Sequence, residues 1–98
     1  MTKNDPYSFQ WKNLGDIEEG RPNLGNMMNV AVYRLMQYTL RDILAHRFSP
    51  EQCGDLFREA GELAGREFCR NVLDKTLPFN QFIAQLQQKL MDLKIGIF

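Results

Sequence analysis

The sequence predicts a small α+β domain in which helices predominate. Three segments repeat their apolar residues with the period of an α-helix, namely residues 30–48, 49–73 and 79–93. Residues 1–29 are punctuated by glycine and proline and show no sustained period, which predicts an arm with turns. Residues 94–98 alternate apolar residues as the start of a β-strand does.

Length and composition bound the class of protein. A chain of 98 residues has room for one domain with a single core, and 44% hydrophobic with 24% charged residues is ordinary for a globular protein. The 12 Lys and Arg balance the 12 Asp and Glu, so no net field attracts nucleic acid or an anionic membrane. The N-terminus has no secretory pattern, and no apolar run is long enough to cross a membrane. These observations predict a cytoplasmic protein with no nucleic-acid partner and no membrane span.

The arm contains two local patterns. Tyr7, Phe9 and Trp11 alternate with polar residues, which fits either a short edge strand or an arm that clamps a neighbour. The tripeptide Asn-Leu-Gly occurs at residues 13–15 and again at residues 23–25. This repeat predicts two similar turns, one on each side of an acidic segment.

The segment 30–48 carries one predicted core face. At 100° per residue, six apolar residues share an arc that we expect to be buried. They are Val32, Tyr33, Met36, Leu40, Ile43 and Leu44. Leu35 and Tyr38 fall outside this arc, so we expect them to be exposed and to form a partner surface.

The start of the segment 49–73 is marked by a capping sequence. Ser49 is expected to be the N-cap, with Pro50 at the first helical position and Gln52 completing a Ser-x-x-Gln capping box. One stripe of this helix is apolar and mostly small. It consists of Cys53, Phe57, Ala60, Gly61, Ala64, Phe68 and Val72.

Glycine is unusually frequent inside this helix. Gly54, Gly61 and Gly65 each lower helix stability by about 0.5–1 kcal/mol relative to alanine, so their presence needs a physical reason. Two explanations are open. The small face packs tightly against another helix, or it forms the wall of a narrow apolar pocket.

Pro78 separates the second helix from the third, because proline disfavours helical geometry at the preceding residue. The segment 79–93 has the cleanest amphipathic pattern in the chain. Its apolar positions are Phe79, Phe82, Ile83, Leu86, Leu90 and Leu93.

Residues suited to catalysis or metal binding are sparse. His46 is the only histidine, which excludes a multi-histidine metal site. Cys53 and Cys69 form no Cys-x-x-Cys pair and are expected to be small core or boundary residues. No phosphate-binding, nucleophile-elbow or dinucleotide motif occurs. The sequence predicts a protein without enzymatic activity, cofactor or metal.

Several segments together resemble a known family. LGDIEEGRPNLG, VYRLMQYTLRDIL, EAGELAGREF and LQQKLMDLKIGIF resemble the N-terminal half of the 4-vinyl reductase domain, whose fold is similar to that of vesicle-tethering (TRAPP) subunits. The resemblance implies helices packed on one side of an antiparallel sheet, a dimer, and a channel for a small hydrophobic ligand. It links the chain to ligand sensing and to tetrapyrrole biosynthesis. The family's C-terminal segment with glycine and paired cysteines is absent, so a truncated form of the family fold is expected.

The sequence and the resemblance together lead to one functional hypothesis and two alternatives. The hypothesis is a non-enzymatic sensory domain that binds a small hydrophobic molecule and forms a homodimer. The expected pocket residues are Tyr33, Met36, Leu40, Phe57, Gly61, Ala64 and Phe68. The first alternative is a protein-interaction or dimerisation module, and the second is a protein of tetrapyrrole biosynthesis.

Overall fold

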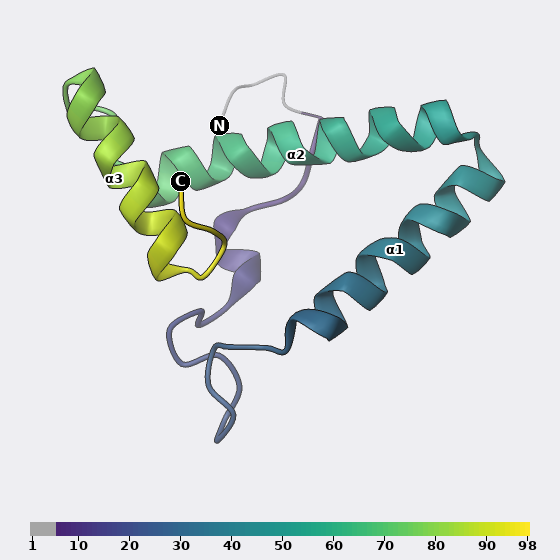
Figure 1. Cartoon of the computed structure of the whole chain (residues 1–98), viewed down its shortest axis with the longest axis horizontal. Coiled ribbons are helices and arrows are strands. Elements are labelled where there is room, and N and C mark those ends of the chain that lie inside the picture. The colour runs from purple at the N-terminus through teal and green to yellow at the C-terminus, as the bar shows by residue number, and fades with distance from the viewer. Residues whose placement is uncertain (1–5) are drawn as a thin grey trace. The chain divides into compact units, whose positions relative to one another are not determined.

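The computed structural model describes residues 6–98 and is predominantly helical, as the sequence predicts (Figure 1). Its three α-helices are α1 (Val30–Arg47), α2 (Pro50–Val72) and α3 (Phe79–Asp92), preceded by a short 3-10 helix, η1 (Trp11–Leu14). Residues 1–5 of the predicted arm lie outside the described residues. The chain divides into two compact units, Met1–Phe57 and Arg58–Phe98, whose boundary falls inside α2.

The arm in the first unit is a series of hydrogen-bonded turns. Asp16 accepts hydrogen bonds at its Oδ1 from the backbone N–H groups of Glu18 and Glu19, at 3.2 and 2.9 Å. The acidic segment is therefore an Asx turn, in which the carboxylate satisfies local backbone donors. The strand that Tyr7 and its alternating neighbours could form is not present, because residues 6–10 have no ladder partner and η1 begins at Trp11.

The second Asn-Leu-Gly tripeptide lies in a tight loop closed between Arg21 and Gly25. The backbone N–H of Leu24 donates to the carbonyl of Arg21 at 3.0 Å, and Asn23 has a φ of 66°, as the third position of a type II turn requires. A Cβ on Gly20 would lie 2.3 Å from the carbonyl oxygen of Gly25, so only glycine fits there. The glycines that end the two Asn-Leu-Gly tripeptides both have positive φ, at 72° and 77°. The turns before them differ, because Asn13 lies in the 3-10 helix η1 whereas Asn23 has a positive φ, so the prediction of two similar turns holds only for the terminal glycines.

Both long helices begin at side-chain caps. The side chain of Asn29 accepts a hydrogen bond from the backbone N–H of Ala31 at 2.8 Å and so starts α1. The Oγ of Ser49 accepts from the backbone N–H of Gln52 at 3.0 Å, and its hydroxyl lies 3.3 Å from Gln52 Oε1. The predicted capping residue of α2 is confirmed.

The corner between α1 and the first turns of α2 is held by buried and half-buried side chains. Cys53 is 1% exposed, and its thiol donates to the carbonyl oxygen of Arg41 at 3.4 Å. The guanidinium carbon of Arg41 lies 4.4 Å from the centre of the Phe57 ring, within the range of a cation–π contact. These contacts join the two helices within the first unit.

The predicted core face of α1 is wrong for the described part of the chain. α1 has no buried residue, and Met36, in the middle of that face, is 64% exposed. Of the six predicted core residues only Leu44 is as much as half-buried. The period of apolar residues shows which side of a helix needs cover, but it does not identify the segment that provides it.

The second unit contains a buried carboxylate near the end of α2. Glu67 is 5% exposed and lies 3.4 Å from Nη1 of Arg70, while Asn71 donates to the Glu67 carbonyl at 2.8 Å. Upstream in the same helix, Gly61 and Gly65 have no atom within 4 Å of the position where a Cβ would stand. Within the second unit, no helix packs against these two glycines.

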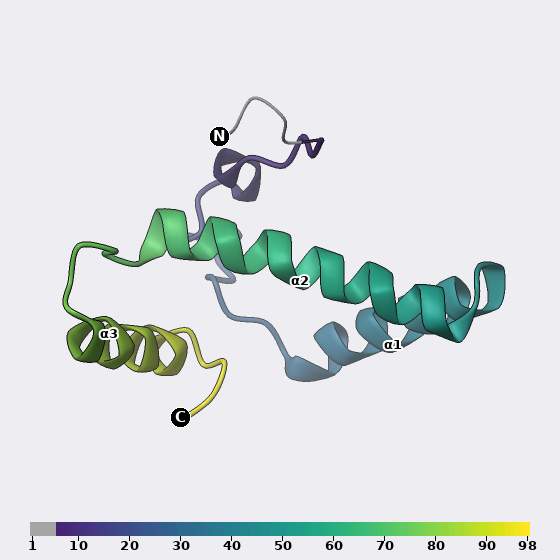
Figure 2. The same cartoon turned by 90° about the horizontal axis from the view of Figure 1, so that it is seen from above.

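The predicted C-terminal β-strand is wrong, because residues 94–98 leave α3 through a helix cap (Figure 2). The backbone N–H of Lys94 donates to Met91 O at 2.9 Å, and that of Ile95 donates to Leu90 O at 2.8 Å. Lys94 has a φ of 61°, so these bonds form a Schellman motif with Lys94 in the left-handed position. The alternating apolar residues of this short segment favour a strand only weakly. The carbonyl groups of the last turn of α3 need hydrogen-bond donors, and the backbone of residues 94 and 95 supplies them. An α+β class therefore has no support among the described residues.

Candidate association surface on α1

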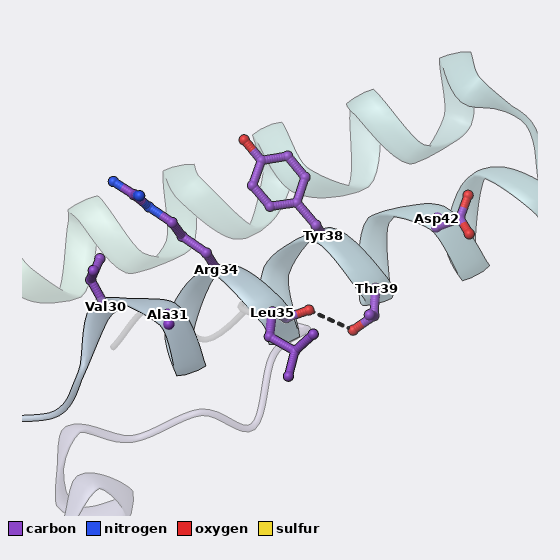
Figure 3. A pocket seen from close by; sticks show the side chains of 7 residues that line it. All are labelled: Val30, Ala31, Arg34, Leu35, Tyr38, Thr39 and Asp42. Carbon is purple, nitrogen blue, oxygen red and sulfur yellow. Dashed lines mark hydrogen bonds between the residues drawn. The ribbon is translucent and has the colours of Figure 1, made fainter.

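The side of α1 that contains Tyr38 is a shallow depression lined by residues spaced four apart. Figure 3 shows Val30, Arg34 and Tyr38 in one row along the helix, with Leu35 and Thr39 in a second row. Residues four apart on an α-helix lie above one another, which explains the two rows. The complete lining is Val30, Ala31, Arg34, Leu35, Tyr38, Thr39 and Asp42.

The centre of this surface is apolar and open. Leu35 and Tyr38 are 66% and 65% exposed, as expected, although Met36 inside the predicted core arc is exposed to the same extent, at 64%. Thr39 does not add a free hydroxyl, because its Oγ1 donates to the carbonyl oxygen of Leu35 at 2.7 Å (Figure 3). An exposed apolar centre of this kind is typical of protein interaction sites.

Opposite charges flank the apolar centre. Arg34 lies one helical turn before Tyr38 and Asp42 one turn after it, and both are exposed. Eight residues separate the two charges, which is about 12 Å along the helix axis, too far for a direct ion pair within one helix. The described residues provide no ion pair for either of them. We call the seven residues lining the depression the Tyr38 surface.

The predicted pocket residues of the first unit lie elsewhere. Tyr33, Met36 and Leu40 are all exposed and face the opposite side of α1 from Tyr38 at 100° per residue. Phe57 lies in α2 and is half-buried beneath the guanidinium of Arg41. None of these four residues lines the depression on α1.

The remaining predicted pocket residues belong to the second unit. Gly61 and Ala64 are exposed on α2, and Phe68 is half-buried. They lie on one side of α2, as their spacing predicts. The pocket that these residues were expected to form with those of the first unit stays a prediction.

Sequence reasoning identified Leu35 and Tyr38 but missed the charged members of the Tyr38 surface. The sequence pattern predicts that Arg34 and Asp42 are ordinary solvent-facing residues, because an amphipathic helix places its charged residues on the polar side. The available signal was their equal spacing of four residues on either side of an exposed tyrosine. This spacing indicates a candidate contact surface only when Tyr38 is known to be exposed.

The described residues include two free cysteines and no cluster of metal-ligand side chains. Within residues 6–98 there is no group of three or more His, Cys, Asp and Glu side chains that could hold a metal ion. Cys53 and Cys69 are free cysteines, one buried and one half-buried, as expected of core and boundary positions. None of the helices in the described part of the chain is both long and apolar enough to cross a membrane.

Comparison with protein-family models, with curated proteins and with solved structures found no match to this chain. The resemblance to the 4-vinyl reductase domain therefore stays a prediction from the quoted sequence segments. The class that the structure establishes is a predominantly helical protein, in which α1 exposes several large apolar side chains.

Proposed function

We propose that this chain is a protein-association module that forms a homodimer through α1. The observation that supports the proposal is the exposure of large apolar side chains on both sides of one helix. Tyr38 and Leu35 are open on one side, and Met36 and Leu40 are open on the other. A surface helix of a globular protein exposes mostly its polar side, so large apolar side chains exposed on both sides of α1 favour a helix that other chains cover.

The small amount of buried apolar surface in the first unit also supports association. The only buried apolar side chain among the described residues of that unit is Cys53, at the corner between α1 and α2. Each large apolar side chain that is fully removed from water contributes about 1.5–3 kcal/mol to stability. Association would supply this contribution, because it covers residues that the chain itself leaves in water.

Native mass spectrometry of protein purified without added ligand tests the proposal. At micromolar concentration we expect a species of twice the 11.5 kDa mass of the chain. Only the monomer mass, at every concentration up to the limit of solubility, would contradict the proposal.

A second candidate function is the binding of a small hydrophobic molecule. The observation that favours it is that Tyr33, Met36 and Leu40 are exposed together on the side of α1 opposite to Tyr38. Methionine and aromatic side chains form adaptable apolar walls, and this side would stay open when the Tyr38 surface is covered. The same mass spectrum tests it, since a bound molecule adds its mass to the protein. Replacing Met36 with glutamine should then remove the added mass.

A further inference from the structure

We infer that two copies of α1 pair in antiparallel orientation, with Tyr38 of each copy at the two-fold axis and Arg34 of each copy opposite Asp42 of the partner subunit. This inference rests on the proposed association and adds to it the face, the orientation and the register of the contact.

The charges determine the orientation. In an antiparallel pair centred on Tyr38, a residue four positions before the centre faces a residue four positions after it. Arg34 then meets Asp42 of the partner subunit, and the two-fold axis repeats this contact. In a parallel pair in register, Arg34 would face Arg34 of the partner subunit and Asp42 would face Asp42 of the partner subunit. Like charges opposite one another disfavour that arrangement.

Both charges lie on the same side of α1 as Tyr38. At 100° per residue, Arg34 is about 40° to one side of Tyr38 and Asp42 about 40° to the other. Figure 3 shows both side chains among those that line the same depression as the tyrosine. Neither side chain has to leave this face to reach the partner helix.

The residues further from the centre also match under the same symmetry. Ala31 lies seven residues before Tyr38 and Ala45 seven residues after it, so small side chains would face each other at both ends of the contact. Small side chains at the ends add no bulk to the contact, whose axis separation is then set by the tyrosines at its centre. Leu35 would face Arg41 of the partner subunit, whose guanidinium lies over its own Phe57. Leu35 would therefore contact the aliphatic part of the Arg41 side chain of the partner subunit.

This match is the reason to assign the surface to a second copy of the chain. A two-fold interface uses the same patch on both subunits, so the patch must be complementary to itself. A surface for a different protein has no need to carry opposite charges at equal distances from its own centre. The Tyr38 surface carries them at four residues on each side.

Sedimentation equilibrium of a charge-swap series tests the inference. Arg34→Asp places two carboxylates opposite each other at both ends of the contact, and Asp42→Arg does the same with two cations. We expect each single variant to raise the dimer Kd about tenfold, and the double variant Arg34→Asp/Asp42→Arg to return it to about the wild-type value. The double variant has the composition and net charge of the wild type, so its recovery reports the cross-subunit pairing.

Arg47→Asp is the matched control, because Arg47 is exposed on α1 about 180° from Tyr38 at 100° per residue. It makes the same change of charge and should leave the dimer Kd unchanged. Circular dichroism of each variant shows whether the helix content of the chain is retained.

The outcomes separate the two proposals. A wild-type chain that stays monomeric overturns both of them. A dimer whose Kd is the same in Arg34→Asp, or is not recovered in the double variant, overturns the antiparallel register and leaves association through another surface.

Discussion

The thiol of Cys53 donates a hydrogen bond to the carbonyl oxygen of Arg41 across the corner between α1 and α2, at 3.4 Å. The carbonyl of Arg41 lies inside α1, so the thiol ties the start of α2 to the body of the preceding helix. Because Cys53 is 1% exposed, this contact is shielded from water. It positions the helix that carries the Tyr38 surface.

Replacing Cys53 with alanine should therefore destabilise the protein. The substitution removes the buried sulfur and its hydrogen bond, and we expect the free energy of unfolding to fall by about 1–2 kcal/mol. Cys69→Ala is the control, since Cys69 is only half-buried, and should cost less. Urea unfolding followed by circular dichroism measures both. Equal losses in the two variants would show that the corner contact does not contribute.

The hydroxyl of Ser49 caps α2 by accepting from the Gln52 N–H at 3.0 Å. Ser49→Ala leaves that donor without its protein acceptor, and we expect a loss of about 1 kcal/mol in the free energy of unfolding. Ser8→Ala is a matched control, because Ser8 is exposed in the arm and outside the helices. If Ser49→Ala and Ser8→Ala unfold at the same urea concentration, the cap does not stabilise α2.

Gly61 lies in the middle of α2, with open space where a Cβ would stand. Gly61→Ala should raise the free energy of unfolding by about 0.5–1 kcal/mol, because alanine has the higher helix propensity. Ala60→Gly, at the exposed neighbouring position, should lower it by a similar amount. Thermal unfolding of both variants gives the comparison. A loss of stability in Gly61→Ala would instead indicate that another backbone or a ligand approaches this glycine, as the sequence pattern suggests.

Asp74 accepts hydrogen bonds from the side chain and the backbone N–H of Thr76, and these bonds hold the pKa of Asp74 below its ordinary value of 3.8. Because the folded state has the lower pKa, the carboxylate contributes its full stabilisation above 3.8 and loses it as the pH falls through the folded pKa. Thr76→Val should raise the pKa of Asp74, whereas Thr76→Ser retains the hydroxyl and should keep it low. Carboxyl chemical shifts measured against pH distinguish these variants. An unchanged titration in Thr76→Val would contradict the assignment.

The helices of this chain were predictable because their signals are local. The predicted segments 30–48, 49–73 and 79–93 differ by one residue or less at each end from α1, α2 and α3. The cap at Ser49 and the break before Pro78 depend only on neighbouring residues, and both are present. Asn29 was missed as the cap of α1, although an asparagine just before an apolar-periodic segment is a recognised start signal.

The errors concern interactions that depend on tertiary structure. A strand at residues 94–98 would need a partner strand, and none exists within the described residues, while Lys94 closes the cap of α3. Burial of Met36 and Leu40 would need a covering element, which no helical period can specify. Only part of the candidate site could be predicted, because the rest depends on contacts outside its own helix. Leu35 and Tyr38 were expected to be exposed and are, but residues inside the predicted core arc are exposed as well. The roles proposed for Arg34 and Asp42 depend on a second molecule.

Cysteine cross-linking at Tyr38 is the most direct test of the central claim that α1 pairs with itself. In a Cys69→Ala background, Tyr38→Cys places one thiol of each subunit at the two-fold axis, where close-packed helices bring facing Cα atoms to disulfide distance. Met36→Cys in the same background is the control, since Met36 is equally exposed but lies on the opposite side of α1. We predict that mild oxidation converts the Tyr38→Cys protein to a covalent dimer and leaves the Met36→Cys protein monomeric on a non-reducing gel. Failure of Tyr38→Cys to cross-link, or equal cross-linking of both variants, would contradict the account.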